Sequence, residues 1–163
     1  MWDTQQRIRR GRIAARRGMH PNTRALVAAA AARLTSGGAI SQVYDHSRLR
    51  YVKVSGSVGN GHVAIFDQER RCYFLGSNGS FYDHGRAAQI LLRINGRTFS
   101  GFDHGDGHQF TGSLQDGGVS IYDHGESAYF NYRVDAPDAG RPSQDSASSA
   151  APAADAGETP RSE

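Results

Sequence analysis

The sequence Tyr82-Asp83-His84-Gly85 returns as Phe102-Asp103-His104-Gly105 and again as Tyr122-Asp123-His124-Gly125, each time after 20 residues. Weaker copies precede it as Tyr44-Asp45-His46-Ser47 and Phe66-Asp67-Gln68-Glu69, with intervals of 22 and 16 residues between successive aspartates. We name these five copies the turn motifs. A period near 20 residues is typical of one supersecondary unit that is used several times and packs against its neighbours.

A second turn signal lies between successive turn motifs. In chain order it reads Gly59-Asn60-Gly61, Asn78-Gly79, Asn95-Gly96 and Asp116-Gly117-Gly118. Asn-Gly and Asp-Gly between apolar runs favour type I′ hairpin turns, in which both central residues have positive φ. A turn motif suits a type I turn that ends in a left-handed glycine, with the Asp carboxylate accepting a backbone N–H. We therefore predict one β-hairpin per repeat, with turn residues Asp45, Asp83, Gly85, Asp103, Gly105, Asp123 and Gly125.

These turns divide the body of the chain into nine expected strands. The strands are 50–58, 62–66, 72–76, 80–82, 89–94, 97–102, 108–114, 118–122 and 128–134. All their connections are short, so neighbours in sequence should be neighbours in space, which predicts an antiparallel meander.

Both faces of this meander carry apolar side chains. Ile65, Phe81 and Ile121 each precede the aromatic residue of a turn motif, and adjacent strand residues point to opposite faces. An open sheet would leave one of these rows in water, whereas a barrel or a covered sheet would bury it. We expect a mainly β fold with a curled or barrel-like sheet. The alternative is a flat hairpin array that binds through an exposed aromatic face.

Residues 22–36 have the features of a short helix. Pro21 stands at its start, Gly37 and Gly38 follow its end, and the alanine-rich run 25–32 favours helix. We expect this helix to lie on one face of the sheet and to cover part of it. A signal peptide that starts at Met19 is the alternative, although its apolar run is short and consists mostly of alanine.

Charge is distributed unevenly along the chain. Residues 1–35 carry eight Arg against one Asp, and residues 135–163 carry two Arg against six acidic residues, while the segment between them is neutral. This pattern predicts a basic arm at 1–21, the helix at 22–36, a hairpin repeat domain at 40–134 and a disordered acidic tail at 135–163. No apolar run approaches the ~18 residues of a membrane-spanning helix, so we expect a soluble, cytoplasmic protein, with secretion as the alternative.

The repeated Asp-His pairs are the main candidates for chemistry. Equivalent turns of a meander recur at every second strand, about 10 Å apart, whereas metal ligands lie about 2 Å from their ion. A small barrel could gather His84, His104 and His124 around one rim, but turn formation explains the repeated Asp better. Cys72 is the single cysteine and indicates neither a disulfide nor a zinc site. We expect no catalytic residue, metal or cofactor, and therefore no enzyme.

Two functions of different classes follow from these features. The first is a non-enzymatic structural or interaction module that binds a protein or ligand through the repeat sheet. The second is weak, sequence-independent binding of nucleic acid or another polyanion by the arm arginines, which are Arg7, Arg9, Arg10, Arg12, Arg16 and Arg17. We favour the first, because arginines without interleaved aromatic residues attract phosphates without specificity.

Overall fold

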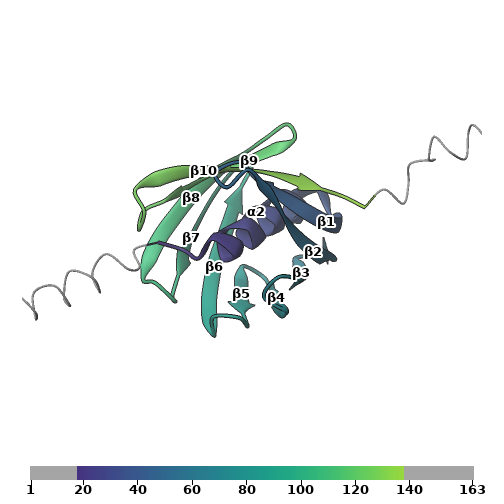
Figure 1. Cartoon of the computed structure of the whole chain (residues 1–163), viewed down its shortest axis with the longest axis horizontal. Coiled ribbons are helices and arrows are strands. Elements are labelled where there is room, and N and C mark those ends of the chain that lie inside the picture. The colour runs from purple at the N-terminus through teal and green to yellow at the C-terminus, as the bar shows by residue number, and fades with distance from the viewer. Residues whose placement is uncertain (1–17, 138–163) are drawn as a thin grey trace, which may run out of the picture.

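The computed structural model describes residues 18–137, which form a closed barrel of ten antiparallel strands around one helix (Figure 1). The elements are α2 (Pro21–Ser36), β1 (Gly38–Asp45), β2 (Arg50–Gly59), β3 (His62–Asp67), β4 (Cys72–Ser77), β5 (Ser80–Asp83), β6 (Ala88–Asn95), β7 (Thr98–Asp103), β8 (His108–Gln115), β9 (Gly118–Asp123) and β10 (Ala128–Asp135). Each strand pairs with its neighbours in sequence, and β10 pairs with β1 to close the barrel. The predicted mainly β meander with an N-terminal helix is confirmed.

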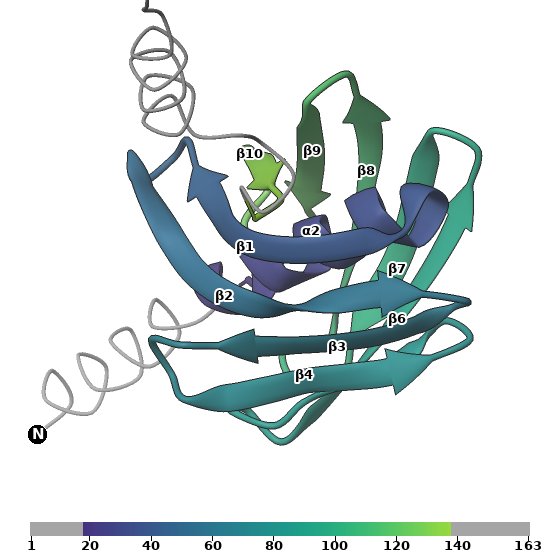
Figure 2. The ribbon, with the colours of Figure 1, turned by 90° about the vertical axis from the view of Figure 1, so that its right-hand side faces the viewer.

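Strand β1 is the strand that the turn signals did not predict. It follows the helix rather than a hairpin turn, and Gly37 and Gly38, with φ of 70° and 119°, turn the chain from α2 into it. Tyr44 of β1 faces Tyr51 of β2 on one side and Arg133 of β10 on the other. Strand β1 therefore completes the barrel wall, and Figure 2 shows it crossing in front of α2 beside β2.

Helix α2 runs inside the barrel, which corrects the prediction that it covers one face of a sheet. Every residue from 22 to 31 is buried, so the helix has no solvent-facing side. From Ala25 to Ala31 the enclosed helix is apolar all round rather than along one stripe, while its polar first turn, Asn22 to Arg24, is also buried. Its run of alanines keeps it narrow, and strands can therefore surround it closely.

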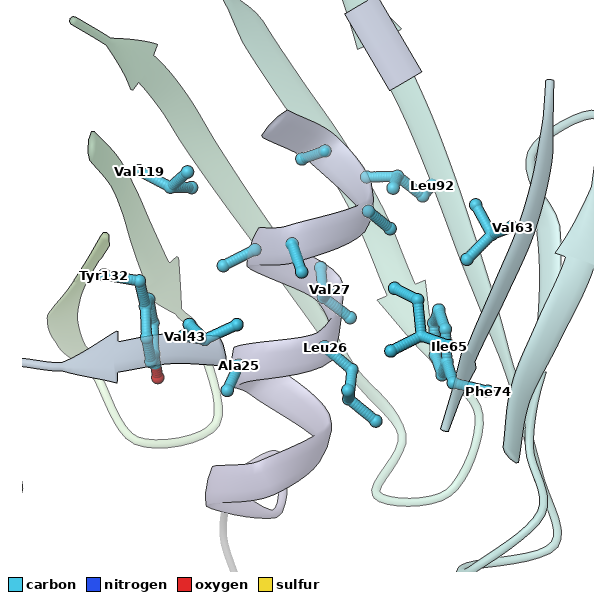
Figure 3. Close-up of a cluster of buried hydrophobic side chains, with 14 of the residues drawn as sticks. Ala25, Leu26, Val27, Val43, Val63, Ile65, Phe74, Leu92, Val119 and Tyr132 are labelled. Carbon is cyan, nitrogen blue, oxygen red and sulfur yellow. The ribbon is translucent and has the colours of Figure 1, made fainter. Parts of the chain in front are cut away.

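The inward-facing strand residues form one core with the helix (Figure 3). Ile65, Phe74 and Leu92 point toward α2 from one side of the barrel. Val43 and Val119 approach it from the other side. Helix and strands are thus parts of a single packed unit, and neither has a separate core.

Inward glycines make room for aromatic rings across neighbouring strands. A Cβ atom added to Gly101 would lie 2.3 Å from the Phe110 ring, and one added to Gly112 would lie 2.2 Å from the Phe99 ring. These residues are direct partners in the β7–β8 pairing. Small and large residues thus alternate across the wall, and this is why Gly101 stands where Ile65, Phe81 and Ile121 stand in the other repeats.

Barrel closure buries only one of the two apolar rows. The row that contains Ile65, Phe81 and Ile121 is fully buried. The aromatic residues of the turn motifs stay on the outer wall, where Tyr82 is 40% exposed and the other four are half-buried. The prediction that a closed barrel would bury both rows is therefore wrong.

The backbone of the turns also differs from the prediction in part. Both central residues have positive φ at Asn60-Gly61 and at Asn78-Gly79, as type I′ turns require, whereas at Asn95-Gly96 and Asp116-Gly117 only the glycine does. In the turn motifs, the left-handed residue is not the motif glycine but the residue four positions after the Asp. These residues are Leu49, Arg71, Ala87, Gly107 and Ser127.

Candidate functional site

The five aspartates of the turn motifs are buried at one end of the barrel. In each motif, one carboxylate oxygen accepts the backbone N–H of the residue two positions later, at 2.7–2.9 Å. This is an Asx-type hydrogen bond that holds the turn. Asp67, in the weakest motif, makes the same bond as the predicted turn residues Asp45, Asp83, Asp103 and Asp123.

The second carboxylate oxygen of several aspartates faces the N-terminus of α2. The Met19 N–H donates to Asp123 Oδ2 at 2.8 Å. Asn22 Nδ2 donates to the carboxylate of Asp67, and the Thr23 hydroxyl donates to that of Asp83. Carboxylates are favourable here because the N-terminal end of a helix carries a partial positive charge. We name the five aspartates of the turn motifs, Asp45, Asp67, Asp83, Asp103 and Asp123, the aspartate ring. The ring fixes the turns and holds the helix in place.

Arginines pair with the aspartate ring in the first three motifs. The pairs are Arg48 with Asp45, Arg70 with both Asp67 and Asp83, and Arg86 with Asp103, at 2.6–3.1 Å. Burial alone would raise the pKa of Asp67, but hydrogen bonds from Arg70 and Asn22 outweigh it and lower the pKa. The Asp67 carboxylate is therefore charged and fully engaged, which suits a structural role rather than proton transfer.

The motif histidines lie on the outer wall, on the opposite side from the aspartates. Each packs edge-on against the aromatic residue two positions earlier, with ring centroids 4.8 Å apart. These histidines are His46, His84, His104 and His124. In each of these motifs the Asp is buried and the His is exposed, so the two side chains lie on opposite faces of the wall. Among residues 18–137, no group of three or more His, Cys, Asp or Glu side chains is placed to hold a metal ion.

Two pairs of tyrosines lie on the outer wall of four adjacent strands, and we name them together with Arg133 the tyrosine patch. The tyrosine patch comprises Tyr122 on β9, Tyr129 and Arg133 on β10, Tyr44 on β1 and Tyr51 on β2. Tyr122 and Tyr129 pack with ring centroids 4.8 Å apart, and Tyr44 and Tyr51 with centroids 4.9 Å apart. Tyr129 is 72% exposed and Tyr51 is 37% exposed.

Arg133 holds part of this patch in a defined arrangement. Its guanidinium lies 5.5 Å from the Tyr44 ring and 5.7 Å from the Tyr51 ring, and it donates a hydrogen bond to the Tyr51 hydroxyl. The guanidinium also pairs with Asp135 at 3.1 Å. Tyr44 and Tyr51 are thus held in place by contacts within the barrel wall.

The exposed residues of the tyrosine patch, Tyr51 and Tyr129, were not predicted from the sequence. The sequence signal for these residues is a second aromatic residue, seven positions after the aromatic residue of a turn motif. It occurs at Tyr51, Tyr73 and Tyr129. The third and fourth motifs have Gln89 and Gln109 at this position instead. The aromatic pairs therefore occur in only three of the five repeats.

Two hollows lie elsewhere on the described surface. One is an open groove of about 740 Å³ over β5 to β8, lined by Ser, Thr, Gln and Arg93 side chains and by the apolar residues Leu91, Leu92, Phe102 and Phe110. The other, of about 360 Å³, lies beyond the C-terminal end of α2 and is lined by Arg33, Arg97 and apolar residues such as Val119. Neither one contains part of the aspartate ring.

Several predictions fall outside the described residues. Arg7, Arg9, Arg10, Arg12, Arg16 and Arg17 lie there, as does the tail from residue 138, so polyanion binding stays a prediction. Within residues 18–137, α2 is too short to cross a membrane. No family model matches the chain, and no curated protein and no solved structure matches it either.

Proposed function

We propose that the protein is a non-enzymatic interaction module that binds a protein partner through the tyrosine patch. The observation that carries this proposal is the edge-on packing of exposed Tyr51 and Tyr129 on half-buried tyrosines, with Arg133 beside the Tyr44–Tyr51 pair. Tyrosine and arginine are enriched among the residues that dominate binding energy at protein interfaces. Rings that are already packed lose little side-chain entropy on binding, which favours affinity.

The interior of the barrel supports the choice of the outer wall. Helix α2 occupies the space in which a barrel could otherwise hold a ligand, and the residues around it are fully buried. A ligand inside the barrel would have to displace the helix and the hydrogen bonds between its N-terminus and the aspartate ring. Outer-wall residues, in contrast, reach a partner without rearrangement.

A comparison of two tyrosine variants tests this proposal. Tyr129→Ser removes the most exposed ring of the patch, while Tyr73→Ser is a matched control, because Tyr73 is 50% exposed and packs against Phe66 outside the patch. Each purified full-length variant is immobilised and the proteins that it retains are quantified against the wild type. We expect Tyr129→Ser and Arg133→Gln to lose partner proteins that Tyr73→Ser still retains. All three variants should have the same thermal stability. Identical retained sets for all variants would refute the proposal.

A further inference from the structure

The fourth turn motif differs from most of the others in the residue that lies opposite its aromatic ring. In three repeats the strand register places a tyrosine opposite the motif ring. Phe102 instead lies opposite Gln109 of β8 on one side and Leu91 of β6 on the other. The Phe102 ring is half-buried, and in the described chain His104 is the only ring that packs against it. An amide and an aliphatic side chain therefore flank this ring where other repeats have a second aromatic residue.

The Phe102 ring lines the open groove of about 740 Å³ over β5 to β8. The strand register aligns the outward side chains of the groove in two rows. One row consists of Ser80, Leu91, Phe102 and Gln109, and the other of Arg93, Ser100 and Thr111. Short hydroxyl side chains thus stand beside longer ones, which hollows the wall. The volume falls within the range of ~300–1,000 Å³ that is usual for small-molecule sites.

Most polar side chains of the groove are free to bind a ligand. Within residues 18–137, the only side-chain hydrogen bond of a groove residue is the one that Ser80 accepts from Gln89, at 2.8 Å. Arg93 is exposed and forms no ion pair with another residue of this part of the chain. No acidic residue lines the groove, so Arg93 gives it a positive charge.

These groups define the chemistry of a ligand that fits. Hydroxyl and amide side chains both donate and accept hydrogen bonds, which suits a ligand with several hydroxyl groups. Leu91, which is 38% exposed, and Phe102 offer an apolar surface to the C–H face of a ring. Arg93 can hold a carboxylate by two parallel hydrogen bonds. We propose that the groove binds a saccharide that carries a carboxylate, such as a chain with uronic acid units.

The groove suits the common macromolecular ligands less well. A peptide that adds a strand to a sheet needs a free edge, and the closed barrel offers none. A nucleic acid needs several cations along its phosphates, and Arg93 is the only charged residue that lines the groove. The tyrosine patch lies on β9, β10, β1 and β2, so the two surfaces are separate and each proposal can fail without the other.

Amide chemical shifts of the full-length protein locate the site. The probe is a tetrasaccharide in which glucuronic acid alternates with N-acetylglucosamine, and the control ligand is the neutral tetramer of N-acetylglucosamine. We expect the acidic probe to shift amides of β6, β7 and β8 around the groove, and the neutral tetramer to bind about tenfold more weakly because it lacks the carboxylate. Equal binding of the two ligands, shifts confined to other residues, or no shift at millimolar probe would overturn the inference.

Two arginine variants test the role of the charge. Arg93→Gln removes the groove cation, whereas the matched control Arg97→Gln removes the same charge from a 74% exposed side chain outside the groove. We expect Arg93→Gln to raise the Kd for the acidic probe about tenfold and Gln109→Ala to raise it about fivefold, while Arg97→Gln leaves it unchanged. An unchanged Kd in Arg93→Gln, or an equal loss in Arg97→Gln, would contradict the proposal.

A simple anion separates saccharide binding from charge attraction alone. Sodium acetate at the same carboxylate concentration supplies the charge without the hydroxyl groups or the apolar ring face. We expect acetate to leave the amides of the groove unshifted. If acetate reproduces the shifts of the tetrasaccharide, the groove is only an anion site and the assignment to a saccharide is wrong.

Discussion

Replacing Asp83 by Asn separates the negative charge of this ring member from its hydrogen bonds. The Asp83 side chain is completely buried; one oxygen accepts the Gly85 N–H at 2.9 Å, and the carboxylate pairs with Arg70 at 3.1 Å. An Asn carbonyl can keep the turn bond, and the Thr23 hydroxyl can reverse its role toward an amide. The Arg70 cation, however, loses one of its two carboxylate partners in a buried site.

These contacts predict a graded loss of stability. Loss of a buried hydrogen bond to a charged group costs about 2 kcal/mol, so we expect Asp83→Asn to lower the free energy of unfolding by that amount. Asp83→Ala also loses the turn bond and should cost about 1 kcal/mol more. Urea unfolding at pH 7 measures both values, with the exposed Asp116→Asn as a control that should match the wild type. If Asp83→Asn is as stable as the control, the ion pair contributes nothing and our reasoning fails.

Two further predictions concern the turn motifs. Gly105→Ala should destabilise by about 1–3 kcal/mol through steric overlap, because the new Cβ would lie 2.4 Å from Arg86 Nη2 and 2.8 Å from Ala88 Cβ; thermal unfolding that matches the wild type would contradict this. The lowered pKa of Asp67 means that its contribution to stability is present above the unfolded pKa of about 3.9 and is lost as the pH falls through the folded pKa. The stability difference between wild type and Asp67→Asn should therefore shrink between pH 5 and pH 2, and a constant difference in urea titrations would argue against it.

The repeat made the strands and hairpins predictable. Asn60-Gly61 and Asn78-Gly79 are strong local signals, because few other residues adopt two successive positive φ values easily. The left-handed residues of the turn motifs were not predictable in this way, since Leu49 and Arg71 have ordinary side chains that no turn preference identifies. Their conformation is imposed by the Asx-type bond and by strand pairing on both sides.

The position of the helix inside the barrel could not be predicted, because it depends on contacts between segments that are far apart in the sequence. An alanine-rich segment is a strong helix former on any surface, so the run 25–32 predicted a helix without indicating what surrounds it. The buried partners Asn22, Thr23 and Arg24 come into contact with the aspartate ring only when the barrel closes. The tyrosine patch likewise arises from closure, because it joins β9 and β10 to β1 and β2.

The enclosed helix has a consequence for the order in which the protein folds during synthesis. Helix α2 leaves the ribosome before any of the strands, yet its surroundings are complete only when β10 has been made and pairs with β1, 93 residues away at Gln42 and Asp135. Until then β1 and the last completed strand have unpaired edges, which are templates for association with other chains. Contacts so distant in sequence form slowly. A chain that ends before residue 128 should therefore leave the nascent sheet open around its helix, and aggregate rather than persist as a smaller fold.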